Sequence, residues 1–259
     1  MTLWHDSLVL EPKGSGHFKA EISDAWNSGS QPNGGYLAAL ALNAMSLNTP
    51  FPDAVASSAF YLSAATVGEA DIEVKELRVG RTTASYEASI TQGKLRTRVT
   101  ATFAELGSTS NGIEFKSDLP PTLSPREECV RFPHKLESGV PLRISEHVEM
   151  LINPNTDVEN AQMLQTAWWR FADGADPDGL SAVLAVDSFI PVVFALGVGT
   201  WCPTLELSTH LRARPAPGWL RVQRRTRLLS QGFFEEDASV WDSNDVLVMQ
   251  SRQLAKMGV

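Results

Sequence analysis

The chain has 259 residues, of which 43% are hydrophobic and 20% are charged, and it carries a net charge of −8 with a pI of about 5.2. This composition predicts a globular protein that is long enough for two hydrophobic cores. The acidic balance and the absence of a long basic run argue against a nucleic-acid partner. Two distant cysteines, Cys129 and Cys202, provide neither a disulfide framework nor a zinc site, and the five histidines show no metal-binding spacing. We therefore expect no metal.

The N-terminal stretch MTLWHDSLVLEPKG contains Asp6 and Glu11 and has no apolar core of a signal peptide. The most apolar run, residues 182–199, is interrupted by Asp187 and Pro191. Because a charge near the centre of a bilayer is costly, we interpret this run as a buried segment and not as a membrane span. The expected location is the cytoplasm.

Residues 33–47 are predicted to form a helix, with Asn33 as its N-cap directly after Pro32. Large apolar side chains lie on every side of this helix, at Tyr36, Leu37, Leu40, Leu42 and Met45. Such a helix is expected to be enclosed by other elements. The strands predicted after it cover residues 59–67, 71–80, 84–91 and 94–106.

Residues 107–142 are rich in proline, serine and glycine and are predicted to be a linker running over a surface. A second set of elements follows, with a buried helical stretch at 180–197 that is interrupted at Pro191. The strands predicted in this half cover residues 143–152, 166–173, 204–213, 218–229, 232–242 and 245–257.

The two halves therefore repeat one order: short strands, one buried helix and a four-strand antiparallel meander. Residues 86–95 can be aligned with residues 234–247, allowing small insertions, so the period is near half the chain and suggests two copies of one domain. One long buried helix wrapped by an antiparallel sheet is the hotdog architecture, and two copies make an α+β double hotdog. A generic α+β pair is the alternative that the pattern leaves open. The predicted units are an N-terminal hotdog at 1–106, the linker at 107–142 and a C-terminal hotdog at 143–259.

A glycine pair, Gly34 and Gly35, opens the first helix. The pair fits neither a P-loop nor a dinucleotide fingerprint, and the next lysine is Lys75. One interpretation is structural, because glycine lets another segment pass close to the helix start. The other is functional, because backbone N–H groups at a helix N-terminus can hold an anion or a polarised carbonyl.

Asp187 lies among apolar residues, where a carboxylate is costly unless it is paired or hydrogen-bonded. Pro191 cannot donate the N–H that would close a helical hydrogen bond onto the Asp187 carbonyl. Asp187 and Ser188 are therefore expected just before a regular helix, near its positive end, where an ionised carboxylate is favoured. A simple helix cap and a catalytic role both remain open.

Gln253 shares a strand face with the apolar Leu247 and Met249, so its amide is expected to face a core or a pocket. The simpler interpretation is a buried glutamine bonded to backbone. The sequence contains no Gly-x-Ser-x-Gly motif, and the acidic run 235–237 is interpreted as a solvated strand face or a turn.

Thr204 and Ser208 lie on the strand TLELSTHL. Strict alternation places Thr204 on the face opposite Leu205 and Leu207, away from the core. Only a bulge or a strand-end position would bring its hydroxyl inward.

Four stretches, in this order, resemble one known family: PNGGYLAALALNAM, VDSFIPVVFALG, TLELSTHLRARPAPGW and DVLVMQSRQL. Together they are similar to the acyl-CoA thioesterase II type of the double-hotdog thioesterase-like superfamily, over nearly the whole chain. The resemblance implies a catalytic trio of aspartate, threonine or serine, and glutamine that activates water. It transfers these roles to Asp187, Thr204 and Gln253, with Ser208 as the second candidate for the hydroxyl. The first half has Ala101, or a close neighbour, in place of Gln253 and a glycine near the position of Asp187, so one active site per chain is expected.

The resemblance further implies an acyl-CoA substrate and no metal or redox cofactor. Asn33, Gly34 and Gly35 would lie at the mouth of the acyl pocket and, together with Ser208, bind the substrate. Helix-start N–H groups, from either helix, would polarise the thioester carbonyl.

Three rival interpretations stay open. One is another hotdog activity such as an acyl-CoA hydratase, although the Asp-x-x-x-x-His pair that such enzymes tend to carry does not occur at the second helix. Another is a non-catalytic acyl-CoA-binding or lipid-binding protein. The third is a purely structural role for Asp187 and Gln253. Exposed sheet edges favour a homodimer or a larger homo-oligomer.

Overall fold

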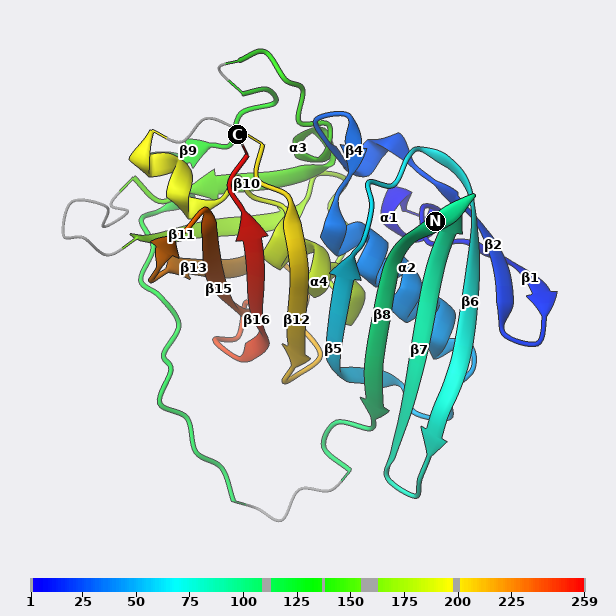
Figure 1. Cartoon of the computed structure of the whole chain (residues 1–259). Coiled ribbons are helices and arrows are strands. Elements are labelled where there is room, and N and C mark those ends of the chain that lie inside the picture. Colours follow the sequence, from blue (N-terminus) through cyan, green and yellow to red (C-terminus); the bar gives the residue numbers. More distant parts are fainter. Residues whose placement is uncertain (1, 109–112, 137, 155–162, 198–200, 259) are drawn as a thin grey trace.

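The computed structural model describes residues 2–108, 113–136, 138–154, 163–197 and 201–258. Within this part of the chain, fourteen strands form one antiparallel sheet that curves around two helices, α2 and α4 (Figure 1). The first half contains α1 (Leu3–Asp6), β1 (Leu10–Gly14), β2 (His17–Ile22), a 3-10 turn (Asp24–Trp26), β3 (Asn27–Ser28), β4 (Gln31–Pro32), α2 (Gly34–Ser46), β5 (Asp53–Tyr61), β6 (Gly68–Val79), β7 (Thr83–Gln92) and β8 (Lys94–Ala104).

The rest of the chain repeats this plan after a largely irregular connection. It contains a 3-10 turn (Arg126–Glu128), β9 (Val130–Arg131), α3 (Ile144–His147), β10 (Val148–Ile152), β11 (Met163–Phe171), α4 (Gly179–Asp187), a 3-10 turn (Val192–Leu196), β12 (Thr204–Leu211), β13 (Leu220–Thr226), β14 (Leu229–Ser230), β15 (Phe233–Trp241) and β16 (Leu247–Lys256).

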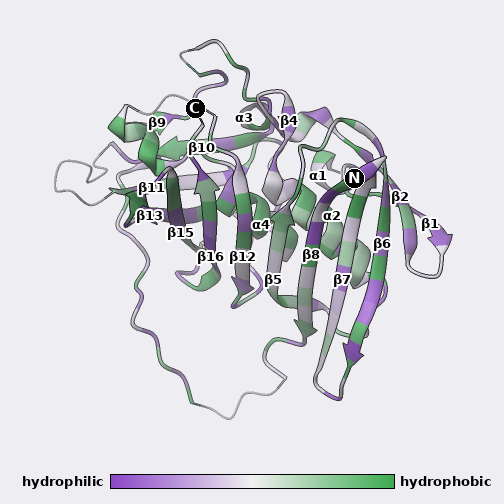
Figure 2. Cartoon of the chain, in the orientation of Figure 1, coloured by the Kyte–Doolittle hydropathy of each residue, from purple (hydrophilic) through white to green (hydrophobic). Residues whose placement is uncertain are grey.

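The sheet runs in the order β1-β2-β6-β7-β8-β5-β12-β16-β15-β13-β11-β10-β9. The two halves meet where β5 pairs antiparallel with β12, and the hydroxyls of Ser57 and Thr209 lie 2.7 Å apart across this junction. Each half places its helix, α2 or α4, against its own strands of the sheet, and Figure 2 shows hydrophobic residues along both helices. The predicted two-unit α+β arrangement is confirmed, whereas the unit boundaries at 106 and 142 stay predictions.

The helix of the first half forms as the sequence predicts. Asn33 has extended backbone angles, and its side-chain oxygen accepts a hydrogen bond from the Tyr36 N–H at 3.1 Å. This caps the first turn of α2. Most α2 side chains are fully buried, because the sheet covers one side of the helix and α4 packs on another.

Most predicted elements have slightly different bounds in the structure, and three differences stand out. The strand predicted at 59–67 is β5, which starts directly after Pro52 and ends at Tyr61. The strand predicted at 143–152 starts instead with the helical turn α3. The apolar stretch 180–197 is broken earlier than expected, because α4 ends at Asp187.

Length and composition alone would allow the segment Gly179–Leu196 to cross a membrane. In the structure it is α4 followed by an irregular stretch and a 3-10 turn, and the α4 side chains from Ser181 to Val186 are buried inside the chain. This part of the sequence is therefore the core helix of the second half, as predicted.

Matching β-bulges relate the two halves residue by residue. β5 is bulged between Ala54 and Ala56 opposite β8, and β12 is bulged between Thr204 and Glu206 opposite β16. In the second pair after each bulge, Ser57 faces Ala101 in the first half and Leu207 faces Gln253 in the second. Ala101 thus occupies the position of Gln253, as the sequence predicted.

The same alignment equates the Tyr61–Thr97 pair with the Leu211–Met249 pair. The contacts at the first residues of α2 and α4 support the same alignment of the two halves. A Cβ added to Gly34 would lie 2.8 Å from the Tyr61 ring, and a Cβ added to Gly179 would lie 3.2 Å from Leu211.

Candidate active site

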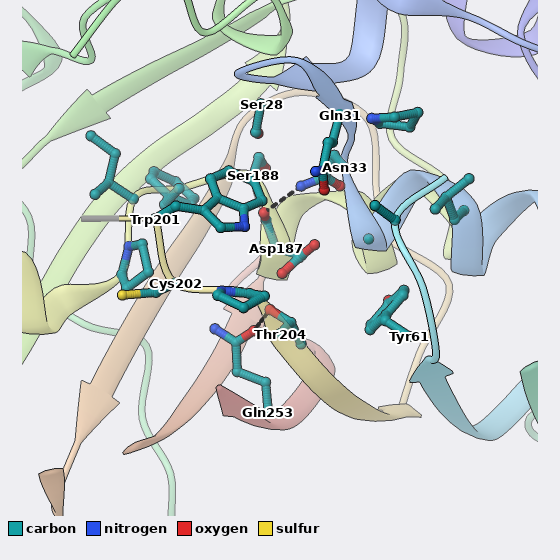
Figure 3. A pocket seen from close by; sticks show the side chains of 18 of the residues that line it. Ser28, Gln31, Asn33, Tyr61, Asp187, Ser188, Trp201, Cys202, Thr204 and Gln253 are labelled. Atoms are coloured by element: carbon teal, nitrogen blue, oxygen red, sulfur yellow. Dashed lines mark hydrogen bonds between the residues drawn. The ribbon is translucent and has the colours of Figure 1, made fainter. Parts of the chain in front are cut away.

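A cavity of about 380 Å³ lies where the start of α2 meets the end of α4 and the first residues of β12. This volume falls within the range of small-molecule sites. Most of the cavity wall is apolar, with Leu37, Phe132, Leu136, Leu142, Phe189 and Ile190 among its residues. Its polar side chains converge from both halves of the chain (Figure 3).

Asp187 is the last residue of α4, so the expected position before a helix is wrong. Ser188 follows as the C-cap, and its hydroxyl donates to the Leu184 carbonyl at 2.8 Å and accepts from Trp169 Nε1 at 3.0 Å. The positive helix end beside Asp187 belongs to the other helix. Asp187 Oδ2 accepts a hydrogen bond from the Gly35 N–H at 2.7 Å, at the N-terminus of α2.

Burial raises the pKa of Asp187 from 3.8 to about 6, and the Glu236 carboxylate also raises it. The Gly35 N–H, the Asn33 amide and the Arg224 guanidinium act in the opposite direction. A carboxylate with this pKa is ionised at neutral pH and is a better proton acceptor than an ordinary aspartate. Both properties suit a general base.

Asn33 ties the two helices together, because it caps α2 and its Nδ2 donates to the Asp187 carbonyl oxygen at 2.7 Å. The Asp187 side chain is directed into the space between Thr204, Gln253 and Tyr61 (Figure 3).

The glycine pair allows this close approach. A Cβ on Gly34 would lie 3.0 Å from Asp187 Oδ2, and a Cβ on Gly35 would lie 2.7 Å from the Val183 carbonyl oxygen. Any side chain here would push α4 away from α2. Both interpretations of the pair therefore hold in part, since the glycines permit close packing and Gly35 donates its N–H, although the acceptor is a carboxylate of the same chain.

Thr204 and Gln253 form the second polar group of the cavity. The bulge at Leu205 breaks the alternation of β12, so Thr204 reaches the cavity on the same side as the core residues. Its hydroxyl donates to Gln253 Oε1 at 2.8 Å. Gln253 is only 7% exposed, as its strand pattern predicted.

Ser208 is not among the residues that line the cavity. Its hydroxyl donates to Glu206 Oε1 at 2.6 Å and lies 3.4 Å from the Ser58 hydroxyl, on the other face of the sheet from the buried Leu207 and Thr209. Of the two candidate hydroxyls, Thr204 is therefore the one at the cavity.

The sequence interpretation of residues 235–237 as a solvated run is wrong for Glu236. This residue is 3% exposed and forms an ion pair with Arg224, which is 2% exposed, at 3.1 Å. Glu236 also accepts from the Val192 N–H at 2.7 Å, and Arg224 donates to the Ile190 carbonyl at 2.8 Å. The pair thus fixes the segment that follows Asp187. Strand alternation with the buried Phe234 and Ala238 was the signal that could have placed Glu236 inside.

Tyr61 lines the cavity, and sequence reasoning missed it. It is the last residue of β5, and its ring lies against Gly34. The strand pattern of the sequence offers no signal for Tyr61, since its contacts are set by the packing of α2 on the sheet. Within the described part of the chain, no cluster of histidine, cysteine, aspartate and glutamate could hold a metal ion.

Comparison with known proteins identifies both halves. Residues 22–104 match the acyl-CoA thioesterase N-terminal domain, and residues 120–257 match the acyl-CoA thioesterase C-terminal domain. An uncharacterized protein of Mycobacterium tuberculosis is 31% identical, over 92% of this chain and 90% of its own length.

Solved structures agree with the family matches. A Thermobifida fusca protein, described provisionally as a thioesterase II, is 28% identical with a TM-score of 0.89, over 100% of this chain and 98% of its own. An acyl-CoA thioesterase II from Mycobacterium marinum, at 14% identity, shares the fold with a TM-score of 0.73, over 98% of each chain. The chain therefore belongs to the acyl-CoA thioesterase family and has its double-hotdog fold.

Proposed function

We propose that this protein hydrolyses acyl-CoA thioesters to a carboxylic acid and CoA, with Asp187 as the general base. The observation that carries the proposal is the convergence of an Asp187 carboxylate of raised pKa and the Thr204–Gln253 pair on one largely apolar cavity. The family match supplies the substrate class.

In the proposed reaction, Asp187 removes a proton from a water molecule as the water oxygen attacks the thioester carbonyl carbon. The tetrahedral intermediate then collapses, the C–S bond breaks, and CoA leaves as a thiolate that takes up a proton. Thr204 and Gln253 hold the water by hydrogen bonds, so that its lone pair faces the carbonyl.

The apolar wall of the cavity would hold the acyl chain. Phe189 and Ile190 are separated from Asp187 only by Ser188, so the acyl group and the base are positioned by one segment. The Arg224–Glu236 pair holds that segment in place through Ile190 and Val192.

The test is thiol release from acyl-CoAs of short, long and aromatic acyl groups, with the wild type and Asp187→Asn compared. The proposal expects turnover of at least one substrate class by the wild type, and a loss of about a thousandfold in the folded variant. Tight binding without turnover would instead support a binding protein. Hydration of an enoyl-CoA without thiol release would support a hydratase.

A homo-oligomeric state and a cytoplasmic location remain predictions. Gel filtration with light scattering would test the first, since an obligate monomer would contradict it.

A further inference from the structure

Thioester hydrolysis needs a hydrogen-bond donor for the substrate carbonyl oxygen, and the N–H groups at the beginning of α2 are the first candidates. The Gly35 N–H, which would polarise a carbonyl in the sequence-based mechanism, already donates to Asp187 Oδ2 at 2.7 Å. A donor for the substrate carbonyl must therefore come from elsewhere in the cavity wall.

Tyr61 places a hydroxyl beside this helix start. Its Oη and Asp187 Oδ2 each lie 3.0 Å from the point that a Cβ of Gly34 would occupy. The two oxygens are therefore at most about 6 Å apart, so a group bound beside one of them also lies near the other. The tyrosine belongs to the first half of the chain, whereas Asp187 belongs to the second.

The Tyr61 hydroxyl is buried and has no hydrogen-bond partner in the described part of the chain. The chain has three tyrosines. Tyr36 donates to the Ser7 carbonyl and Tyr86 donates to the Asn48 carbonyl, each at 2.9 Å. Because buried polar groups are nearly always paired, an orphaned hydroxyl at a cavity wall indicates a partner that is not protein.

Thr97, the cross-strand neighbour of Tyr61, has the same property. Its hydroxyl is buried and unpartnered, and the residue lines the cavity. At the equivalent positions of the second half stand the apolar Leu211 and Met249. The fold thus does not require polar side chains at these two positions. Of the two equivalent pairs, only the pair at the cavity, Tyr61 and Thr97, is polar.

The electrostatic surroundings keep Tyr61 a hydrogen-bond donor. Burial raises the pKa of its phenol well above the ordinary value, and the Asp187 and Glu206 carboxylates raise it further. The hydroxyl therefore stays protonated throughout the pH range of an enzyme assay.

We propose that Tyr61 is a catalytic residue whose hydroxyl donates a hydrogen bond to the carbonyl oxygen of the bound thioester. The proposal rests on the proposed function and adds a residue of the first half to the site. As water attacks, the carbonyl oxygen gains negative charge, and a positioned donor stabilises that charge more than it stabilises the ground state. Tyr61 lines the cavity, so its ring borders the space that the substrate would occupy.

The kinetic test compares Tyr61→Phe with Tyr86→Phe as a matched control. Tyr61→Phe is expected to lower kcat about a hundredfold, with KM within about threefold of the wild type and no loss of thermal stability, because no protein hydrogen bond is broken. Tyr86→Phe is expected to lower stability and leave kcat unchanged. A Tyr61→Phe enzyme with the kcat of the wild type would overturn the proposal.

A binding test decides the role of Tyr61 even if the wild type hydrolyses none of the thioesters. It uses two inert CoA derivatives of equal chain length: a ketone analogue, in which CH₂ separates sulfur from the carbonyl, and an alkyl thioether without a carbonyl. The wild type is expected to bind the ketone about tenfold more tightly, and Tyr61→Phe is expected to bind both equally. The proposal is overturned if the wild type shows no preference, or if Tyr61→Phe keeps it. Failed hydrolysis by the wild type would overturn only the proposed function.

Discussion

The two ends of the packed helices α2 and α4 are equivalent by the internal repeat, yet only one end has the polar groups of the candidate active site. At the cavity end stand Tyr61, Asp187 and Gln253. Counting from the first residue of each helix places Leu42 opposite Asp187, and the bulged strands place Leu211 and Ala101 opposite Tyr61 and Gln253. These three counterparts are buried and apolar.

This contrast shows that the repeated fold creates two equivalent ends, and that the sequence places polar side chains at only one of them. The glycine expected near the position of Asp187 in the first half is not its counterpart. The glycines at the start of α2 contact Asp187 itself. The first half therefore supplies the glycines and the second half supplies Asp187, so both halves are needed for the one candidate site.

The two halves also differ in the strands that pack against the helices, β6 and β7 in the first half and β13 and β15 in the second. Sheet register places Val74 and Tyr86 of the first half at the positions of Arg224 and Glu236. Both pairs are buried, but only the second is ionic. A buried ion pair is seldom more stabilising than apolar residues, so its presence behind Asp187 indicates a positioning role.

The largest expected effect is on stability, at this ion pair. Glu236→Gln leaves the Arg224 guanidinium buried without its counter-ion, and we expect a loss of about 3–5 kcal/mol in the free energy of unfolding. Denaturant melts would measure it. The double variant Arg224→Met/Glu236→Leu removes both charges and should recover most of that stability. A Glu236→Gln protein as stable as the wild type would show that the pair is not a structural constraint.

Asp187→Asn is expected to stabilise the protein at neutral pH. The pKa of Asp187 is raised from 3.8 to about 6 in the folded chain. The folded state therefore binds the proton more tightly, and wild-type stability falls as pH rises from about 4 to 6. The asparagine does not titrate, so its advantage should grow over this window to about 3 kcal/mol and stay constant above it. Unfolding at pH 5 and pH 8 would measure this, and an equal difference at both values would contradict it.

Replacing Gln253 or Ala101 by the residue at the equivalent position of the other half should have a smaller effect, and this effect should be on activity. Gln253→Ala installs the residue of the equivalent position and removes the acceptor of the Thr204 hydroxyl. We expect kcat to fall about 10- to 100-fold with little change in KM. The matched control, Ala101→Gln, alters the other end and should leave kcat unchanged. Equal kinetic effects of the two variants would remove the distinction between the ends.

The smallest effect is expected on the other face of the sheet. Ser208→Ala removes a hydroxyl that contacts Glu206 and Ser58 but not the cavity. Activity should stay within twofold of the wild type and stability within about 0.5 kcal/mol. A large loss of kcat in steady-state assays would return Ser208 to the site in place of Thr204.

The local sequence pattern was sufficient to predict most helices and strands and part of the candidate site. The apolar run of α2, the Asn33 cap and the inward face of Gln253 follow from spacing alone. The position of Thr204 depended on a bulge that no local pattern specifies, because it is set by the register with β16. Asp187 was misplaced because its positive neighbour is the start of a helix about 150 residues away in the chain. The orphaned hydroxyl of Tyr61 depends on the packing of α2 on the sheet, which the sequence does not encode locally.

The most direct test of the account is the pH dependence of kcat/KM for the best acyl-CoA substrate, followed by the loss of thioester absorbance. With Asp187 as the base, kcat/KM should be constant above about pH 7 and fall tenfold per unit below its pKa of about 6. The residual activity of Asp187→Asn should lack this inflection. A wild-type profile that stays flat from pH 5 to 8, or an inflection that survives in the variant, would contradict Asp187 as the general base.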